Sequence, residues 1–480
     1  MGYIATGVPN LDTILGGGLP ESYLVLITGG PGTGKTVLVQ QMASRYARET
    51  GKVLYVTALS EAHSTLVAHL SGFTFFDRSL LGERIIIINV FPVARQGLTA
   101  VTTTIVRTLK DHKISLLVFD GFRSLRDIHA NEREVRAFSY ELAGTLAAMK
   151  TTSLFTSESA AGWAEDAPEV RIADGLLSLS AEWTGTRFQR TLEVVKLRGA
   201  HPLRGPHFVC ISKDGLAVYP RPESVYTAPS GAPPEARLSL GLAKLDEMLG
   251  GGLPAGSSTY VLGDPGVGKT LLGLHFLAAG LAAGESGIFV GFQETPDHLL
   301  AKAATAGLDL RAALASGSLR ILHFPAIELA ADRVAWELWA EAERLGARRV
   351  VIDGATQLQR SVGAEREAGF TTAVMAHLSA KGATVMLLRT REDLSGFLPP
   401  AEESPLEAVA DNLITMRLID VEGKLRRALA VVKMRDSAHD NTVRVYTIDE
   451  RGLQIGGQFK GEDTAARADR PPPGGDSGKA

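Results

Sequence analysis

Apolar runs of strand length recur along the chain, and each is followed by glycine-rich, acidic or basic residues. They lie within residues 23–29, 53–66, 114–122 and 192–202 of the first half, and within 287–300, 348–356 and 429–439 of the second. Residues 36–49, TVLVQQMASRYARE, carry apolar side chains at helical spacing instead. A strand, a glycine-rich loop and a helix therefore follow one another, which is the context that a phosphate-binding loop requires.

The two halves of the chain are copies of one another. TGVPNLDTILGGGLPESYLVLITGGPGTGKT at 6–36 aligns without gaps with LGLAKLDEMLGGGLPAGSSTYVLGDPGVGKT at 240–270, at a constant offset of 234. This identity indicates a tandem duplication. The segments between and after the copies are rich in proline, serine and glycine or poor in apolar residues. The expected parts are a first domain (1–220), a linker (221–236), a second domain (237–460) and a disordered tail (461–480).

Composition excludes several classes of protein. The 480 residues are 45% apolar and 21% charged, as in ordinary globular proteins, and the net charge of −3 gives no general attraction to nucleic acid or anionic membrane. No apolar run approaches the roughly 18–20 residues of a membrane helix. A single cysteine, Cys210, excludes an internal disulfide framework and fits a reducing compartment. We expect a cytoplasmic protein that binds neither membrane nor nucleic acid.

GGPGTGKT at 29–36 and GDPGVGKT at 263–270 match the P-loop pattern. The glycines let backbone amides surround phosphate oxygens, and the helix N-terminus adds partial positive charge. The lysine reaches the β- and γ-phosphates, where it also assists catalysis, and the threonine hydroxyl ligates Mg²⁺. The sequence therefore predicts ATP and Mg²⁺ as ligands. The candidate binding residues are Gly29, Gly32, Thr33, Gly34, Lys35 and Thr36, and Gly263, Gly266, Val267, Gly268, Lys269 and Thr270.

An aspartate closes one buried strand in each copy. ISLLVFDGF ends its apolar run at Asp120, and RRVVIDGAT ends its run at Asp353. A carboxylate in that position is costly unless it meets a cation or donors. We expect each aspartate to hold Mg²⁺ with the P-loop threonine. The alternative is that each aspartate caps the following turn.

A third acidic position provides the candidate general base. Glu61 and Glu294 follow strand-like runs and share an offset of 233, as do Asp120 and Asp353. One residue was therefore gained or lost before this strand end, and the spacing to the aspartate of 59 residues then holds in both copies. We expect both glutamates to polarise the attacking water. The alternative is that each glutamate caps the helix that follows.

A Lys-x-Arg pair follows an apolar run near the end of each copy. Lys196 and Arg198 occur in LEVVKLRGAHP, and Lys433 and Arg435 occur in LAVVKMRDSAH. Residues i and i+2 of a strand point to one face, so two cations are expected side by side. We expect them to contact a nucleotide phosphate, because the pair recurs in both copies. The alternative is a charged strand edge.

Together these motifs resemble the KaiC family, which are double-domain ATPases of the RecA-like P-loop class. The resemblance covers roughly residues 1–460, and its most specific parts are LDxxLGGGLP, QETP, DGATQL and VVKMR followed by His439 and Asp440. It implies an α/β fold of two tandem RecA-like domains, each with a mostly parallel sheet flanked by helices. It also implies a homohexamer of two stacked rings with ATP between neighbouring subunits. There, Lys196, Arg198, Lys433 and Arg435 reach the neighbour's nucleotide, and the arginines assist catalysis.

The chain departs from the family pattern at two places. Each strand end carries one glutamate instead of two, in the pairs Ser60–Glu61 and Gln293–Glu294. Glu407 and Ala408 occupy the position of the family's Ser–Thr phosphorylation pair, which leaves Ser404 and Thr415 as nearby substitutes. The first departure predicts slow turnover, and the second argues against a phosphorylation timer.

The reading favoured by these motifs is a hexameric signalling ATPase with two ATP sites per chain, which acts together with a protein partner. Three alternatives remain open at this point. The same site could serve a Ser/Thr autokinase, or ATP could serve only to assemble a scaffold. A RecA-like recombinase or helicase would require basic loops with interleaved aromatic residues. We find no such cluster in the sequence, and nucleotide contact already explains its most basic stretch, residues 187–198.

Overall fold

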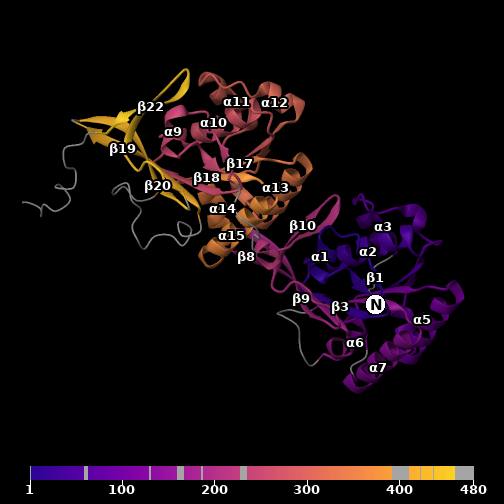
Figure 1. Cartoon of the computed structure of the whole chain (residues 1–480). Coiled ribbons are helices and arrows are strands. Elements are labelled where there is room, and N and C mark those ends of the chain that lie inside the picture. The colour runs from indigo at the N-terminus through magenta and orange to yellow at the C-terminus, as the bar shows by residue number, and fades with distance from the viewer. Residues whose placement is uncertain are drawn as a thin grey trace, which may run out of the picture. The chain divides into compact units, whose positions relative to one another are not determined.

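The computed structural model describes residues 2–58, 63–128, 131–158, 167–184, 187–227, 235–391, 410–421, 423–435 and 437–459. The chain divides into two compact units, Met1–Val225 and Tyr226–Ala480, coloured from indigo to magenta and from pink to yellow in Figure 1. Residues 228–234 of the predicted linker and the predicted tail, 461–480, lie outside the described residues.

Each unit is built around one nine-stranded sheet, and the strand order is equivalent in the two. The orders are β11-β10-β9-β8-β3-β7-β6-β4-β5 and β22-β21-β20-β19-β14-β18-β17-β15-β16. The strands from β8 to β5 and from β19 to β16 run parallel, whereas the others are antiparallel. This architecture confirms the predicted α/β class and the duplication.

The first unit contains β1 (Tyr3–Ile4), α1 (Leu11–Leu15), β2 (Leu19–Pro20), β3 (Leu24–Gly29), α2 (Lys35–Glu49), β4 (Val53–Thr57), α3 (His63–Leu70), η1 (Arg78–Leu80), β5 (Ile85–Asn89), α4 (Phe91–Ala94), α5 (Leu98–His112), β6 (Leu116–Asp120), α6 (Ser124–Ile128), α7 (Glu132–Ala148), β7 (Thr152–Glu158), α8 (Pro168–Ile172), β8 (Gly175–Thr184), β9 (Arg187–Leu197), β10 (His207–Ser212), β11 (Gly215–Tyr219) and η2 (Pro222–Val225).

The second unit contains β12 (Arg237–Leu238), α9 (Ala243–Met248), β13 (Leu253–Pro254), β14 (Ser258–Gly263), α10 (Lys269–Ala282), β15 (Gly287–Gly291), α11 (Pro296–Thr305), α12 (Arg311–Ser316), β16 (Leu319–His323), η3 (Ala326–Glu328), α13 (Ala331–Leu345), β17 (Arg349–Asp353), α14 (Ala355–Val362), α15 (Ala364–Ala380), β18 (Thr384–Thr390), β19 (Asn412–Val421), β20 (Lys424–Met434), β21 (Arg444–Asp449) and β22 (Gly452–Gln458).

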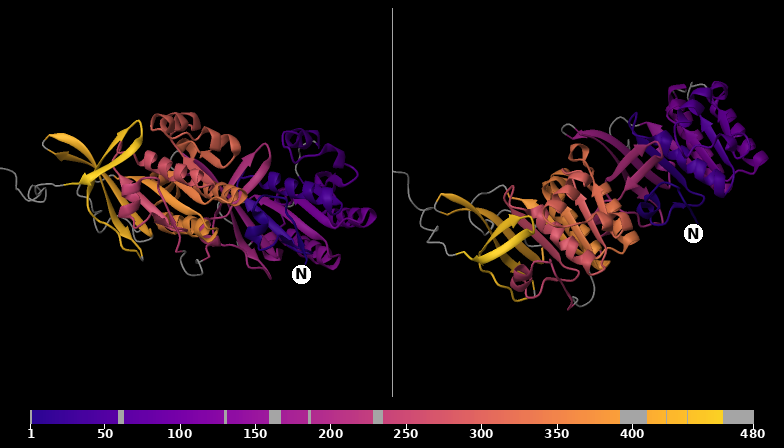
Figure 2. Two further views of the ribbon diagram at one scale, coloured as in Figure 1. Left: turned by 45° about the horizontal axis from the view of Figure 1, so that its top comes forward. Right: turned by 90° about the horizontal axis from the view of Figure 1, so that it is seen from above.

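Helices cover both faces of each sheet, as the two views of Figure 2 show. In the first unit, Val25 and Ile27 of β3 join a core with α1 and α2, whereas Leu24 and Leu26 join a core with α5 and α7. Alternate side chains of a strand face opposite sides, so a strand covered on both faces is apolar throughout. This burial explains the continuous apolar run that the sequence shows before the first P-loop.

The parallel strands bring several chain segments to one edge of the sheet. The strands β3, β7, β6 and β4 are neighbours, and their carboxyl ends are Gly29, Glu158, Asp120 and Thr57. Ligands of open α/β sheets bind outside the carboxyl ends of parallel strands. The second unit repeats this arrangement with β14, β18, β17 and β15.

Among the described residues, no helix combines the length and the apolar character needed to cross a bilayer.

Candidate functional site

The first P-loop joins β3 to α2 and directs its lysine back over the loop. The Lys35 Nζ donates hydrogen bonds to the carbonyl oxygens of Gly29 and Gly30, at 2.9 and 2.8 Å. Burial lowers the pKa of Lys35, and the charges of Glu158 and Asp120 oppose this shift. The ammonium group is therefore held at the loop, close to two carboxylates.

The second P-loop places its lysine in the same way. The Lys269 Nζ donates hydrogen bonds of 2.9 Å to the carbonyl oxygens of Gly263 and Asp264. Burial lowers the pKa of Lys269, and the charges of Asp353 and Asp264 oppose the shift. Both lysines thus have the position that a P-loop lysine needs for a phosphate.

The backbone conformation and the neighbouring side chains both favour glycine at the last glycine position of each loop. Gly34 and Gly268 precede the first helical residue with φ values of 107° and 97°, which favour glycine. A Cβ atom at either position would lie 2.7 Å from the Cδ1 of Ile211 or Ile448, on β10 and β21. A larger residue would therefore strain the backbone and displace the isoleucine side chain that packs against the loop.

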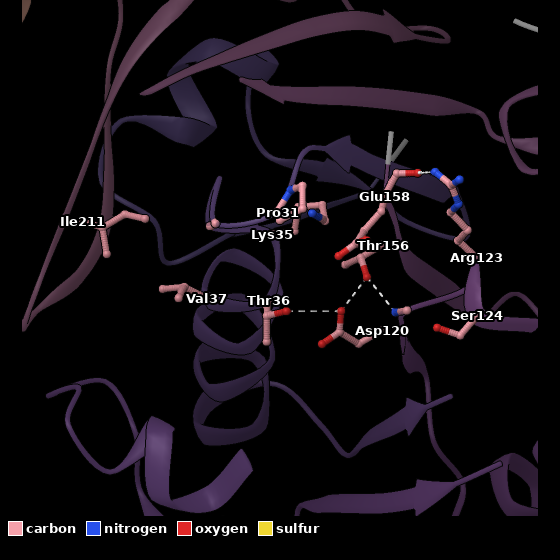
Figure 3. Close-up of a pocket in the computed structure, with 13 residues that line it drawn as sticks. Pro31, Lys35, Thr36, Val37, Asp120, Arg123, Ser124, Thr156, Glu158 and Ile211 are labelled. Atoms are coloured by element: carbon pink, nitrogen blue, oxygen red, sulfur yellow. Dashed lines mark hydrogen bonds between the residues drawn. The ribbon is translucent and has the colours of Figure 1, made fainter. Parts of the chain in front are cut away.

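Each P-loop opens into a cavity, of about 630 Å³ in the first unit and about 560 Å³ in the second. Figure 3 shows the first, with the loop, Asp120 and Glu158 around it. The predicted binding residues that line the cavities are Gly32, Gly34, Lys35 and Thr36, and Gly266, Gly268, Lys269 and Thr270.

Of the remaining loop candidates, Gly29 and Gly263 end β3 and β14, whereas the side chains of Thr33 and Val267 turn inward. The hydroxyl of Thr33 donates to the Gly30 carbonyl at 2.9 Å. Val267, at the same loop position in the second copy, is fully buried in the core, and its carbonyl accepts a bond from Tyr446. These side chains stabilise the loop rather than line the cavity.

Asp120 ends β6 with its carboxylate surrounded by hydroxyl groups. The Oγ1 atoms of Thr36 and Thr156 donate to Oδ1 at 3.4 and 2.5 Å, and the Tyr55 hydroxyl donates to Oδ2 at 2.5 Å. Figure 3 shows the two threonine contacts. Asp120 is only 4% exposed, so these donors stabilise a charge that burial would otherwise penalise.

Asp353 occupies the same place in the second unit with fewer donors. The Thr270 Oγ1 donates to its Oδ2 at 2.6 Å. Strand pairing places Phe289 and Leu388 where the first unit has Tyr55 and Thr156. Burial raises the pKa of Asp353, and the Thr270 hydrogen bond opposes the shift. The repeated Thr–Asp pairs thus differ in their surroundings.

The Thr–Asp pairs fit a magnesium ion. A P-loop Mg²⁺ takes one hydroxyl, one carboxylate and phosphate or water oxygens. No group of three or more His, Cys, Asp or Glu side chains suited to a metal occurs among the described residues. Thr36 with Asp120, and Thr270 with Asp353, are the residues that would hold the ion.

The Tyr55 hydroxyl gives a stability prediction. Tyr55→Phe removes a buried donor to a carboxylate, so we expect the first domain to lose about 1–3 kcal/mol of unfolding free energy. Urea denaturation of the full chain measures this loss. Tyr140→Phe is the control, because Tyr140 is 51% exposed on α7. Equal unfolding midpoints for the two variants would show that the Tyr55 hydrogen bond contributes no net stability.

Glu294 lines the second cavity and forms an ion pair with Lys302 of α11. The charge of Glu294 also raises the pKa of Asp353, so the two carboxylates are close enough to interact. Among the described residues, the buried Oε2 of Glu294 has no hydrogen-bond donor. Lys302 also lines the cavity. The sequence analysis did not identify it, although it lies in the helix that directly follows Glu294.

Glu61 lies outside the described residues, but the strands before it are informative. Thr57 and Gly291 pair with Asp120 and Asp353, respectively, and keep the offset of 234. The one-residue change therefore lies after Thr57 and Gly291 and before Asp120 and Asp353, which are offset by 233. Glu294 follows Gly291 by three residues, whereas Glu61 follows Thr57 by four.

Three further residues of the first cavity escaped the sequence analysis. Glu158 ends β7, while Arg123 and Ser124 follow Asp120 by three and four residues. The sequence signal for Glu158 is weak, because its strand, TSLFTSE, has only two apolar residues, whereas β6 is apolar up to Asp120. Arg123 donates a hydrogen bond of 2.8 Å to the Glu158 backbone carbonyl, as Figure 3 shows.

The Lys-x-Arg pairs make the same contacts in both units. Lys196 and Lys433 donate to the carbonyls of Ala173 and Ala410, at 2.7 and 2.8 Å. Each lysine follows a β-bulge in its strand. The arginine two residues after each lysine pairs with an aspartate: Arg198 with Asp174 at 3.2 Å, and Arg435 with Asp411 at 3.4 Å. Among the described residues that line the cavities, none of these four cations occurs.

Of the residues at or near the predicted phosphorylation position, the structure describes only Thr415. Thr415 is fully buried within β19, between β14 and β20, so its hydroxyl cannot receive a phosphoryl group without opening the sheet. Glu407, Ala408 and Ser404 lie outside the described residues.

A small aromatic and basic cluster lies at and beside the start of the most basic stretch, residues 187–198. Trp183 and Phe188 are in contact at the tip of the β8–β9 hairpin, with ring centroids 5.2 Å apart, and the Arg190 guanidinium lies 4.8 Å from the Phe188 centroid. Trp183 is 71% exposed. A cluster of this size is much smaller than the channel of stacking side chains that a single strand of nucleic acid needs.

Known proteins resemble the chain over nearly its whole length. The chain is 27% identical over 469 residues to the circadian clock oscillator protein KaiC of Picosynechococcus, covering 95% of this chain and 90% of the relative. It is 28% identical over 472 residues to the protein of that name from Rippkaea orientalis, covering 95% and 89%. It is 24% identical over 476 residues to the circadian clock protein KaiC3 of Synechocystis, covering 95% and 92%.

The family model of the KaiC ATPase matches the chain twice. The matches span residues 4–223 and 238–459, and each contains one nine-stranded sheet, one P-loop cavity and one Thr–Asp pair. The folds of the two units accordingly correspond to tandem RecA-like domains. The chain therefore belongs to the KaiC family of ATPases and carries the ATPase domain of that family in duplicate.

Proposed function

We propose that each domain binds ATP with Mg²⁺ and hydrolyses it, so that the chain has two ATP sites. The observation that carries this proposal is the repeated arrangement of a P-loop lysine and a Thr–Asp pair around one cavity. A phosphate-binding loop alone would serve a binding protein equally well. The additional carboxylate in the cavity, Glu294 in the second domain, supports hydrolysis.

The second domain suggests how the reaction proceeds. Mg²⁺ held by Thr270 and Asp353 would supply positive charge to the phosphate oxygens. Lys269 stabilises charge on the β- and γ-phosphates. Glu294, held by Lys302, accepts a proton from the attacking water. The water oxygen bonds to the γ-phosphorus, the bond to the bridging oxygen breaks, and ADP leaves with that oxygen. The equivalent role of Glu61 in the first domain rests on the sequence.

We further propose a homohexamer in which Lys196, Arg198, Lys433 and Arg435 approach the nucleotide of a neighbouring subunit. Two observations support this proposal. None of the four side chains is among the described residues that line the cavities of its own chain, and both arginines are exposed. The side chains of Arg198 and Arg435 are 61% and 56% exposed. An arginine supplied by a neighbour stabilises charge on the transferred phosphoryl group.

The biological role that we propose is regulatory. The relatives named above are circadian clock proteins, and the family membership supports a cytoplasmic signalling ATPase with a protein partner. Autophosphorylation is a second activity that the same site could perform. The burial of Thr415 removes one candidate acceptor, and no described feature favours another.

One experiment tests hydrolysis and autophosphorylation together. Full-length protein is incubated with γ-labelled ATP, and released phosphate and protein-bound label are followed in parallel. We expect slow Mg²⁺-dependent release of phosphate and no protein-bound label. Protein-bound label that matches the ATP consumed would identify a kinase, whereas bound but unhydrolysed ATP would identify a scaffold.

Glu294→Gln tests the proposed base in the second domain. In a chain whose first site is silenced by Lys35→Ala, we expect phosphate release to fall about 100-fold, because the amide cannot take a proton. ATP binding should persist, since Glu294 lies outside the P-loop. Asp297→Asn is the matched control: Asp297 is exposed on α11 and does not line the cavity. Equal rates for the two variants would remove Glu294 from the mechanism.

A further inference from the structure

The second P-loop carries a charged residue that the first loop lacks. Asp264 is the second residue of GDPGVGKT and stands at the position of Gly30 in GGPGTGKT. It is only 5% exposed, and its backbone carbonyl accepts a hydrogen bond from Lys269. A buried carboxylate in a phosphate-binding loop is unfavourable, because burial penalises the charge and the charge repels the ligand. Asp264 therefore requires a compensating partner.

Arg417 of β19 provides the compensating charge. Its Nε donates to the Asp264 Oδ2 at 3.2 Å, and the Leu418 amide donates to the same oxygen at 2.8 Å. The Asp264 amide in turn donates to the Met416 carbonyl at 3.2 Å. One loop residue is thus bonded to three consecutive residues of β19. Arg417 is itself 5% exposed, so little solvent screens the attraction between the two charges.

The charge of Asp264 also reaches the lysine of the phosphate site. Burial lowers the pKa of Lys269, and the Asp264 charge is one of two that oppose this shift. Among the described residues, the buried Oδ1 of Asp264 has no hydrogen-bond partner, so the compensation depends on the contacts of Oδ2. Without Arg417, the carboxylate would compete with the ATP phosphates for the Lys269 ammonium group.

The first domain holds its P-loop lysine without this ion pair. Strand pairing places Ser180 at the position of Arg417, and Gly30 stands at that of Asp264. Neither residue carries a charge, yet both P-loop lysines make the same two carbonyl contacts. The acidic loop residue and the basic strand residue thus occur together in one copy and are replaced together in the other. This pattern indicates that Arg417 serves to offset Asp264.

We propose that Arg417 is a positioning residue of the second ATP site, which neutralises Asp264 and thereby keeps Lys269 available for the β- and γ-phosphates. This inference rests on the ATP site proposed for the second domain. Arg417 acts through Asp264, because it is not among the described residues that line the cavity. Its role is electrostatic, so breaking the ion pair from its two ends should change ATP binding in different ways.

The test uses the full chain with its first site silenced by Lys35→Ala, and it measures the Kd for ATP by competition with a fluorescent ATP analogue. We expect Arg417→Met to raise this Kd at least about tenfold, because it leaves a buried carboxylate unpaired beside Lys269. We expect Asp264→Asn to lower the Kd or to change it by less than about threefold, because it removes a negative charge near the phosphates.

Two outcomes of this comparison would overturn the proposal. Equal weakening of ATP binding in Arg417→Met and Asp264→Asn would show that the ion pair only anchors the loop. An Arg417→Met chain that binds ATP as tightly as its parent would show that the Asp264 charge does not reach the phosphate site.

A double variant keeps the test decisive if Arg417→Met does not fold. Asp264→Gly/Arg417→Ser gives the second loop and its strand the residues of the first domain, so its Kd should lie within about threefold of the parent. A folded double variant whose Kd is raised tenfold or more would overturn the proposal, because no unpaired charge is left to explain the loss.

A control separates this inference from the function on which it rests. Arg366→Met breaks an ion pair with the buried Asp332, neither residue lines the cavity, and the Kd should not change. A Lys35→Ala chain that binds no ATP at all would overturn the proposed second ATP site, and the role of Arg417 with it. Weak binding confined to Arg417→Met leaves that site intact and supports the proposal.

Discussion

Replacing Arg435 by alanine is expected to reduce ATP turnover in the second domain by about 1,000-fold, the lower end of the range for an arginine supplied across an interface. The Arg435 side chain is 56% exposed and anchored to Asp411, so its loss should leave the domain folded. Phosphate release in a Lys35→Ala background measures the effect. Arg333→Ala, an exposed residue of α13 that pairs with Glu337, is the control for loss of a surface arginine.

A mixing experiment distinguishes a neighbour's arginine from one that acts within its own chain. Chains with Lys269→Ala cannot bind at the second site, and chains with Arg435→Ala cannot assist a neighbour. In rings formed from equal amounts of both, about one quarter of the second sites should combine an intact loop with an intact arginine, as a head-to-tail ring requires. If mixed rings are no more active than the Lys269→Ala/Arg435→Ala chain, Arg435 does not act between subunits.

The second large effect concerns nucleotide binding. Lys35→Ala and Lys269→Ala should each weaken ATP binding at one site by about 1,000-fold, because two charge-assisted hydrogen bonds of about 2 kcal/mol each are lost. Equilibrium binding should fall from two nucleotides per chain to one in either variant. The double variant should bind none.

Each lysine also makes internal contacts, so a folding control is needed. Lys35→Arg and Lys269→Arg keep the charge but not the geometry of the compact ammonium group. Circular dichroism and thermal unfolding should match the wild type in all four variants. A wild-type chain that binds a single nucleotide would show that one of the two sites is degenerate.

The fold followed from the sequence because its signals are local or repeated. The P-loops, the duplication and the strands ending in Asp120 and Asp353 can be identified within short segments. The resemblance then implied the mostly parallel sheet. The fold class could be predicted without knowledge of side-chain contacts, and the structure confirms it. The finer predictions about individual site residues remain predictions.

The surroundings of the site could not be predicted in the same way. Tyr55 and Thr156 reach Asp120 because β4, β6 and β7 are neighbours, although these residues are far apart along the chain. A motif contains no information about which strand pairs with which. The same reason explains why Glu158 was missed. The burial of Thr415 likewise depends on its position inside the sheet.

The unequal hydroxyl neighbours of Asp120 and Asp353 bear on how duplicated genes diverge. Tyr55 and Thr156 correspond to Phe289 and Leu388, yet both copies keep the same Thr–Asp pair. Differences at two positions outside the motifs therefore give the two aspartates surroundings of different polarity. Selection can adjust paralogous domains through such neighbours while the catalytic signature stays constant. Equal motifs in two halves of a chain thus indicate common ancestry and do not imply equal chemistry.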